Sequence, residues 1–125
     1  MKEIKPRKLK AAVMFDIKQP LRIIDLDIPS LEEGQVLVKI LFSGVCRSQV
    51  MELEGGRGDD KWLPHFLGHE GSGKVIDAGK GVTKVKKGDD VILGWIKGEG
   101  KDAPGANFEY GSQLINAGQV TTFCN

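Results

Sequence analysis

The clearest indication of the fold is the segment Gln35-Val36-Leu37-Val38-Lys39-Ile40-Leu41-Phe42-Ser43-Gly44-Val45. From Val36 to Phe42 every residue except Lys39 is apolar, and Val, Ile and Phe are enriched in β-strands. The run follows Glu32-Glu33-Gly34, a polar segment typical of a turn. A nearly continuous apolar run of this kind predicts a strand covered on most of both faces, and we expect it to lie near the core.

Short β-branched runs separated by turn residues occur on both sides of this strand and predict more strands. Besides residues 35–45, the expected strands cover residues 9–15, 21–28, 71–78, 82–86 and 90–95, and a further strand is expected to begin at residues 120–123. Residues 55–61 and 96–118 are expected to form loops, because glycine and polar residues dominate them. Closely spaced strands without long helices between them favour a mainly β barrel or sandwich over a doubly wound sheet.

The size and charge of the chain exclude several classes of function. With 125 residues, of which 40% are hydrophobic, it can bury one modest core, so we expect a single domain over residues 1–125. The formal net charge of +1 leaves no broad positive field for nucleic acid or anionic lipid. No apolar run reaches the ~20 residues of a membrane span, and none near the N-terminus reaches the roughly 7–15 residues of a signal-peptide core. We therefore expect a cytoplasmic protein that binds neither nucleic acid nor membranes.

The first motif that carries chemistry is Gly44-Val45-Cys46-Arg47-Ser48-Gln49. It places a thiol between the strand expected at residues 35–45 and a short helix expected at residues 48–54, with Ser48 as the helix cap. Unpaired N–H groups at the start of a helix favour a thiolate. A free cysteine is also often buried for packing alone. The only other cysteine, Cys124, is too distant in sequence to suggest a disulfide scaffold or a zinc ribbon.

The second motif is Leu67-Gly68-His69-Glu70-Gly71, in which an imidazole and a carboxylate stand between glycines. Zinc binds cysteine sulfur at about 2.3 Å and histidine nitrogen at about 2.0–2.1 Å, and catalytic sites commonly combine three protein ligands with one open position. Cys46 and His69 suit such a site, although a lone histidine is more often structural. His65 stands four residues before His69, but Pro64 disfavours a shared helix here, so we interpret His65 as a surface or packing residue.

Together and in this order, the two motifs resemble the zinc-binding signature of medium-chain alcohol dehydrogenases with a GroES-like catalytic domain. The resemblance extends from the strand at residues 9–15 to the turn at Lys87-Gly88-Asp89-Asp90-Val91. It implies a GroES-like, partly open β-barrel with short helices. It also implies that the chain is the N-terminal part of the catalytic domain of an oxidoreductase, which converts a small alcohol to an aldehyde or ketone with NAD or NADP.

The resemblance implies roles for individual residues as well. Cys46 and His69 match two protein ligands of the catalytic zinc, and Glu70 matches an adjacent carboxylate that ligates the metal or exchanges with its bound water. Ser48 matches a hydroxyl that hydrogen-bonds the substrate alcohol and starts proton removal, a role compatible with a helix cap. Arg47 matches a position that reaches the pyrophosphate of the cofactor, although an ordinary surface arginine is the alternative.

The sequence departs from the family pattern at several positions. Gln49 stands where an aspartate often orients the zinc-bound histidine, and we expect its carbonyl to accept the same N–H. Met51 stands where some members carry a relay histidine. Residues 96–118 contain no cysteine, so we expect no structural zinc. The third zinc ligand and the cofactor motif G-x-G-x-x-G are also missing, so we expect the chain alone to bind zinc weakly and to be inactive.

Two alternatives remain open at this stage. One is a GroES-like module that serves binding or oligomerisation without catalysis, and the other is a zinc-free relative similar to the quinone reductases. The set of Cys46, His69 and Glu70 argues against both. Because the last expected strand starts so close to Asn125, we also expect unpaired sheet edges and hence self-association or a homo-oligomer.

Overall fold

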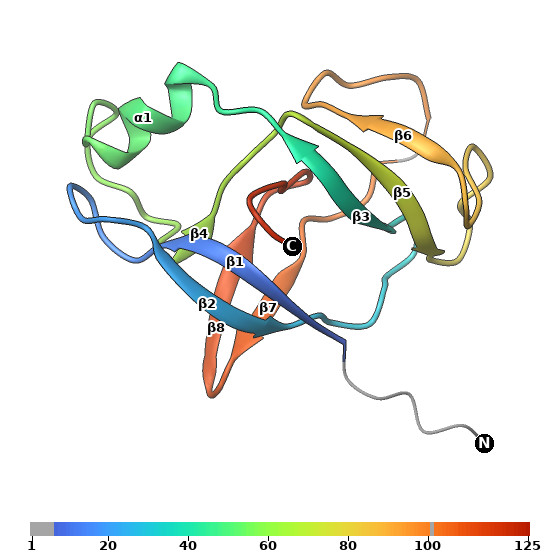
Figure 1. The fold of residues 1–125 in the computed structure, drawn as a ribbon, viewed down its shortest axis with the longest axis horizontal. Helices are drawn as coiled ribbons and strands as arrows, with labels where there is room; N and C mark the ends of the chain where they lie inside the picture. The colour runs from blue at the N-terminus through green and yellow to red at the C-terminus, as the bar shows by residue number, and fades with distance from the viewer. Residues whose placement is uncertain (1–6, 101) are drawn as a thin grey trace.

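The computed structural model describes residues 7–100 and 102–125 and confirms a mainly β fold with one short helix among those residues (Figure 1). The elements in chain order are β1 (Lys8–Met14), β2 (Arg22–Asp27), β3 (Val36–Ser43), α1 (Arg47–Leu53), β4 (His65–Phe66), β5 (Gly71–Ala78), β6 (Asp90–Leu93), β7 (Asn107–Tyr110) and β8 (Gln113–Ala117). A closed barrel has the strand order β1-β2-β7-β8-β4, and a separate three-stranded sheet has the order β3-β5-β6. In the described part of the chain, no helix has the length and apolar character needed to cross a membrane.

The barrel encloses the main apolar core. Strands alternate their side chains between two faces, and in β2 this alternation buries Ile24 and Leu26 while Asp25 faces solvent. Phe66 of β4 and Phe108 of β7 meet edge to face with ring centroids 4.8 Å apart, a geometry worth roughly 0.5–1.5 kcal/mol beyond the area buried. The buried cluster consists of Ala11, Val13, Ile24, Leu26, Phe66, Phe108 and Ile115.

Strand β3 is less buried than its sequence predicts. It pairs with β5 and forms an edge of the three-stranded sheet. None of its residues is fully buried, and Leu41 and Phe42 are 55% and 76% exposed. The expectation that this strand is covered on both faces is therefore wrong, because only one of its faces is turned toward the barrel.

Residues 82–86, expected to be a strand, instead belong to a pair of turns. The Val82 N–H donates to Gly79 O at 3.4 Å, and the Asp89 N–H donates to Lys86 O at 3.1 Å. These local hydrogen bonds occupy backbone groups that a strand would offer to a neighbour. The β-branched residues of this segment therefore do not extend the sheet.

Residues 96–118, expected to be a loop, contain the β7–β8 hairpin of the barrel. Each strand contributes one fully buried apolar residue, Phe108 in β7 and Ile115 in β8. Gly111 occupies the first position of the two-residue turn with φ +59°, a conformation that glycine adopts readily. The expectation of a loop is wrong because so few apolar residues give too weak an alternation to reveal the strands.

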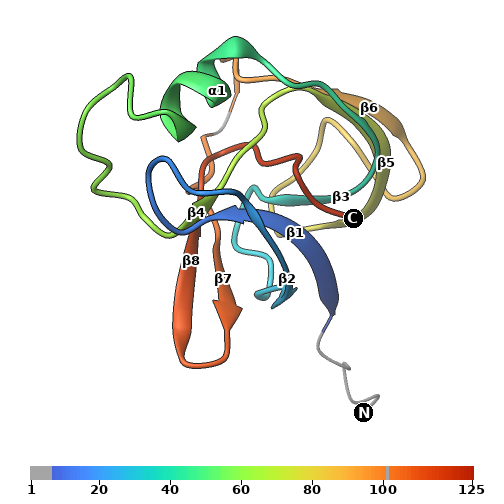
Figure 2. The ribbon, with the colours of Figure 1, turned by 60° about the vertical axis from the view of Figure 1, so that its left-hand side comes forward.

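The last residues of the chain lie between the barrel and the three-stranded sheet (Figure 2). Residues 120–123 form no regular strand, and one isolated bridge joins Cys124 to Ala11 of β1. On the other side, the Phe123 N–H donates to Leu67 O at 3.1 Å. This segment is thus hydrogen-bonded on both sides and offers no open edge, while self-association of the chain stays a prediction.

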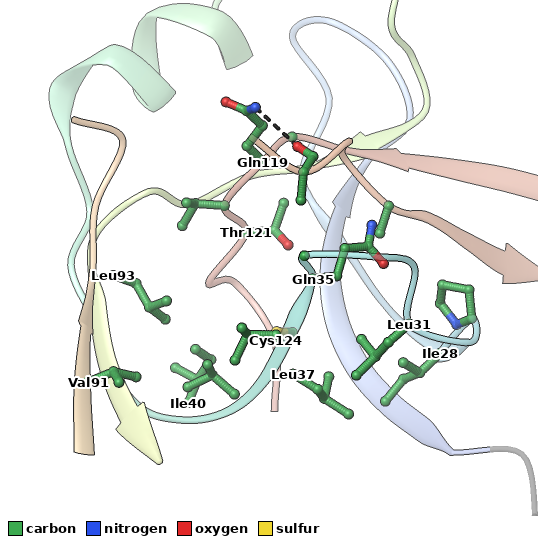
Figure 3. Close-up of a pocket in the computed structure, with 18 of the residues that line it drawn as sticks. Ile28, Leu31, Gln35, Leu37, Ile40, Val91, Leu93, Gln119, Thr121 and Cys124 are labelled. Carbon is green, nitrogen blue, oxygen red and sulfur yellow. Dashed lines mark hydrogen bonds between the residues drawn. The ribbon is translucent and has the colours of Figure 1, made fainter. Parts of the chain in front are cut away.

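A cavity of about 390 Å³ lies between the barrel and the three-stranded sheet (Figure 3). Its wall is mainly apolar and includes Leu37 and Ile40 of β3, Leu93 of β6 and Cys124. Burial raises the pKa of the Cys124 thiol to about 11, so this thiol stays neutral at physiological pH. Cys124 is therefore a packing residue, in contrast to Cys46.

Candidate metal centre

Two loops bring Cys46, His69 and Glu70 together. Cys46 lies between β3 and α1, whereas His69 and Glu70 lie between β4 and β5. The loops meet because β3 and β5 are paired, with Ser43 at the end of β3 opposite Gly71 at the start of β5. One ligand atom from each of the three side chains lies within 4.8 Å of the other two. The strand register thus converts two separate sequence motifs into one cluster.

Helix α1 begins one residue earlier than the sequence predicts. Cys46 is its N-cap, with extended backbone angles of φ −95° and ψ 149°, and Arg47 is the first helical residue. The side-chain carbonyl of Gln49 accepts the Cys46 backbone N–H at 2.8 Å and closes the turn. The expectation that Ser48 caps the helix is therefore wrong, and its hydroxyl is directed to the Cys46 thiol instead.

The surroundings of Cys46 favour its thiolate. Hydrogen bonds from the Ser48 hydroxyl and the Ser48 N–H hold the pKa of the Cys46 thiol below its ordinary value, and the Arg47 N–H adds to this effect. Burial and the negative charge of Glu70 raise this pKa but do not outweigh the hydrogen bonds. Since the thiolate is the form that binds metals and attacks electrophiles, Cys46 is chemically distinct from Cys124.

Two glycines allow the loops to approach one another. Gly68 has φ +102°, and a side chain there would collide with Thr122 and Phe123. The Gly44 N–H donates to Glu70 O at 2.9 Å, and a Cβ on Gly44 would lie 2.5 Å from a carboxylate oxygen of Glu70. A side chain on Gly68 would push the loop that carries His69 away from the last residues of the chain, and a side chain on Gly44 would displace the Glu70 carboxylate.

Gln49 is buried, with 2% of its surface exposed, and lies between the two candidate ligands. Its Oε1 accepts the Cys46 N–H, while its Nε2 lies 3.4 Å from His69 Nδ1. The expectation that the Gln49 carbonyl accepts the histidine N–H is therefore wrong, because the amide nitrogen of Gln49, and not its oxygen, faces the ring. The amide instead donates toward Nδ1, and His69 Nε2 faces Glu70 Oε1 at 3.5 Å.

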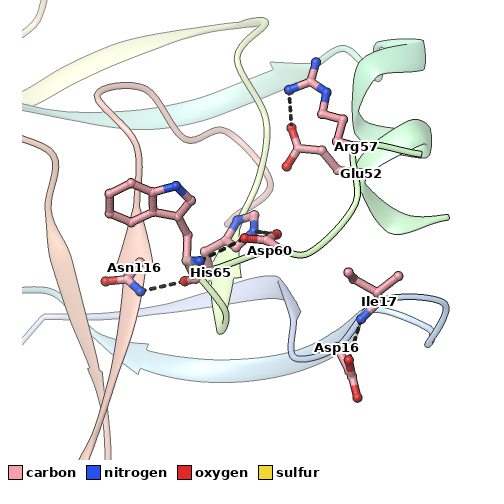
Figure 4. A network of polar contacts seen from close by, with 8 residues as sticks. Asp16, Ile17, Glu52, Arg57, Asp60, His65 and Asn116 are labelled. Carbon is pink, nitrogen blue, oxygen red and sulfur yellow. Dashed lines mark hydrogen bonds and ion pairs between the residues drawn. The ribbon is translucent and has the colours of Figure 1, made fainter. Parts of the chain in front are cut away.

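His65 belongs to a different group of side chains (Figure 4). Its Nε2 lies 2.6 Å from Asp60 Oδ2, and the two side chains are only 12% and 14% exposed. Burial raises the pKa of Asp60, but the hydrogen bonds from His65 and the Trp62 N–H, with the charge of His65, outweigh burial and hold that pKa below its ordinary value. Glu52 is close to this pair but is itself ion-paired with Arg57 at 3.4 Å. Ligand atoms of Glu52, Asp60 and His65 also lie within 4.8 Å of one another, so the interpretation of His65 as a surface or packing residue stays a prediction.

A second cavity, of about 880 Å³, borders the cluster on the side of His69. Gln49 and His69 form part of its wall, which continues through Asp60, Trp62 and His65. The wall therefore combines the candidate metal ligand with polar and aromatic side chains. A space of this size accommodates a small organic molecule next to the imidazole.

The donor set of the cluster fits a zinc ion. Thiolate sulfur, imidazole nitrogen and carboxylate oxygen are the ligands that zinc uses in proteins, and bonds of about 2.0–2.3 Å in a tetrahedron place ligand atoms roughly 3–4 Å apart. The spacing within 4.8 Å requires only a small closure of the loops around an ion. Glu70 would take the place of the third protein ligand that the sequence lacks, and one position would stay open, as in catalytic sites.

The other two residues singled out from the sequence lie on the first turn of α1, beside Cys46. Ser48 donates its hydroxyl hydrogen to the Cys46 sulfur, and Arg47 is exposed. Thr122, whose hydroxyl contacts the Glu70 carbonyl at 3.2 Å, was not predicted from the sequence. No sequence signal distinguishes this threonine from any other in a β-branched run.

Comparison with known proteins identifies the family. Residues 32–123 match the alcohol dehydrogenase GroES-like domain. The chain is 45% identical over 86 residues to S-(hydroxymethyl)glutathione dehydrogenase of Synechocystis sp., which covers 68% of this chain and 23% of that protein. This chain thus spans about a quarter of the length of the curated relatives it matches.

Solved structures agree with this match. Benzyl alcohol dehydrogenase from Acinetobacter calcoaceticus has a TM-score of 0.59 and 30% identity, over 67% of this chain and 23% of that one. An alcohol dehydrogenase from Thermotoga maritima has a TM-score of 0.60 and 33% identity, over 69% of this chain and 25% of that one. With most of its length matched, the chain belongs to the alcohol dehydrogenase family that is defined by a GroES-like domain.

Proposed function

We propose that this chain supplies the zinc-binding part of the active site of an alcohol dehydrogenase that uses NAD or NADP. The observation that carries the proposal is the convergence of Cys46, His69 and Glu70, with ligand atoms within 4.8 Å of one another. Residues 1–125 would form the N-terminal part of the GroES-like catalytic domain. Because the sequence contains no G-x-G-x-x-G, the nicotinamide cofactor would bind mainly outside these residues.

The properties of each side chain support a metal site over simple packing. Cys46 has a thiol pKa held below its ordinary value, so its sulfur is ready to act as a ligand. Glu70 keeps 51% of its side chain exposed, which leaves the carboxylate accessible to an ion or a water molecule. His69 Nε2 faces Glu70 Oε1 at 3.5 Å, so the imidazole and the carboxylate point into the same space. Side chains that served only for packing would not need to bring three metal-ligand atoms within 4.8 Å of one another.

The chemistry follows from the open position of the site. A zinc ion held there supplies a Lewis acid that lowers the pKa of a bound alcohol. The Ser48 hydroxyl lies beside Cys46, where it lowers the pKa of the thiol, and its oxygen lone pairs can accept a hydrogen bond from the substrate hydroxyl. Arg47 is exposed next to this hydroxyl and offers a positive charge and a planar donor group to a cofactor pyrophosphate.

The proposal extends to the class of substrate but not to one compound. The relatives are named for S-(hydroxymethyl)glutathione and for benzyl alcohol, two alcohols of very different size and charge. We therefore propose a small-molecule alcohol or aldehyde as the substrate. A cytoplasmic location and a homo-oligomeric enzyme complete the proposal.

Zinc titration by calorimetry tests the site directly. We expect one zinc ion per chain for the wild type. Cys46→Ser or His69→Ala should each weaken binding by more than about 100-fold, because the loss of a ligand costs more than the 10–100-fold typical of an outer partner. Glu70→Gln should weaken binding less, since a carboxamide oxygen can still reach the ion.

The chain offers matched controls, because it contains only two cysteines and two histidines. Cys124→Ala and His65→Ala remove the same side-chain types outside the cluster of Cys46, His69 and Glu70, and both should leave the zinc affinity of that cluster near that of the wild type. Zinc binding that is indifferent to Cys46→Ser and His69→Ala would reject the site. In that case the non-catalytic GroES-like module becomes the better explanation of the fold.

A further inference from the structure

Thr122 is a polar residue that is almost completely buried, with 1% of its surface exposed. Its Oγ1 lies 2.8 Å from Ser43 Oγ and 3.2 Å from the backbone oxygen of Glu70. Ser43 is the last residue of β3 and precedes Cys46 by three positions, while Glu70 directly follows His69. One hydroxyl therefore connects the strand end that leads to one candidate ligand with the loop that carries the other two.

The two hydrogen bonds of Thr122 are compatible with its single hydroxyl hydrogen. A carbonyl oxygen only accepts, so Thr122 donates to Glu70 O. The Ser43 hydroxyl then donates to Thr122 Oγ1 at 2.8 Å, a shorter contact than its other one, to Gly44 O at 3.4 Å. The three groups form a chain that runs from β3 to the loop before β5. Removing the middle hydroxyl breaks both contacts at once.

The remaining atoms of Thr122 pack against the backbone on either side of His69. Before His69, the Thr122 N–H donates to Leu67 O at 3.3 Å, and a Cβ on Gly68 would collide with Thr122 Oγ1. After His69, a Cβ on Gly71 would lie 3.0 Å from Thr122 Cγ2. The glycines thus create a notch into which Thr122 fits, so that the chain flanking His69 is held at two points.

We propose that Thr122 is a positioning residue that sets the distance between Cys46 and His69 and thereby the affinity of the site for a divalent metal. The metal part of this inference rests on the proposed function, whereas the coupling of the two loops does not. The Gly44 N–H also joins the loops, through Glu70 O at 2.9 Å. Loss of the Thr122 hydroxyl should therefore loosen the site and not abolish it.

Two substitutions separate the hydroxyl of Thr122 from its methyl group. Thr122→Val keeps the shape but removes both hydrogen bonds, while Thr122→Ser keeps the hydroxyl and removes the methyl group that faces Gly71. Co²⁺ is the probe, because its thiolate charge-transfer absorption reports sulfur ligation. We expect Thr122→Val to weaken Co²⁺ binding by about tenfold or more, the size typical of an outer partner. Thr122→Ser should bind Co²⁺ like the wild type, even though it unfolds at a lower temperature.

A second measurement needs no metal. Amide hydrogen exchange of Gly44 in the metal-free protein reports the contact of its N–H with Glu70 O, and Thr122→Val should accelerate this exchange. Thr121→Val, which removes a hydroxyl from the neighbouring residue, is the control and should change neither readout. Ser43→Ala removes the contacts of Ser43 Oγ with Thr122 Oγ1 and with Gly44 O but keeps the bond from Thr122 to Glu70 O. Because Ser43 is exposed, this variant should give a smaller change in the same direction.

The outcomes distinguish the two proposals. A wild type without Co²⁺–thiolate absorption, combined with faster Gly44 exchange in Thr122→Val, would reject the metal site and support the coupling of the loops. Unchanged Co²⁺ affinity and unchanged Gly44 exchange in Thr122→Val would overturn the role of Thr122. An equal loss of affinity in Thr122→Ser and Thr122→Val would overturn it as well, because packing and not the hydroxyl would then set the geometry.

Discussion

At the scale of single residues, the two cysteines show how the surroundings determine the chemistry of a side chain. Cys46 stands at the start of α1 with hydrogen bonds from Ser48, and its thiol pKa lies below the ordinary value. Cys124 lines an apolar cavity, and burial raises its pKa to about 11. The surroundings of Cys46 therefore favour the thiolate that binds a metal, whereas those of Cys124 keep its thiol neutral.

This contrast predicts selective alkylation. In metal-free protein at neutral pH, iodoacetamide should modify Cys46 much faster than Cys124, because the thiolate is the reactive form. The rate at Cys46 should fall only when the pH drops below its lowered pKa, whereas the rate at Cys124 should stay low until the pH approaches about 11. Mass spectrometry of the labelled peptides across a pH series measures both rates.

Ser48→Ala provides the control for this prediction. It removes the largest cause of the lowered pKa, so the pH midpoint for alkylation of Cys46 should move up toward that of a free thiol. Equal rates at the two cysteines, or a midpoint unaffected by Ser48→Ala, would contradict the described environments.

At the scale of the elements, two phenylalanines on strands have opposite surroundings. Phe108 of β7 is buried against Phe66, whereas Phe42 of β3 is 76% exposed. Phe108→Ala should lower the free energy of unfolding by about 3–5 kcal/mol, and Phe42→Ala should change it by less than about 0.5 kcal/mol. Urea unfolding of both variants measures these differences. If Phe42→Ala lowered the free energy of unfolding as much as Phe108→Ala does, the exposed position of Phe42 in β3 would be contradicted.

Those same strands show what the sequence could predict. The strands with β-branched residues at alternate positions were predictable, and so was the placement of both ligand motifs at strand ends. The exposure of β3 was not, because an apolar run does not say which sheet edge it occupies. The β7–β8 hairpin was missed, since each strand buries one apolar residue fully, Phe108 or Ile115. Contacts of Thr122 across 79 and 52 positions leave no local pattern at all.

At the scale of the whole molecule, the candidate site lies where three parts of the fold meet. The three-stranded sheet supplies the loop with Cys46, the connection from β4 of the barrel to β5 supplies His69 and Glu70, and the last residues place Thr122 between them. Two cavities, of about 390 Å³ and about 880 Å³, flank this junction. The position of the cluster therefore depends on the barrel and the sheet keeping their arrangement.

X-ray absorption at the zinc edge, on the protein loaded with one equivalent of zinc, identifies the atoms that bind the ion. We predict one sulfur at about 2.3 Å together with nitrogen and oxygen at about 2.0–2.2 Å. The sulfur contribution should disappear in Cys46→Ser and persist in Cys124→Ala. A first shell of only nitrogen and oxygen in the wild type would contradict a metal centre built on Cys46 and His69.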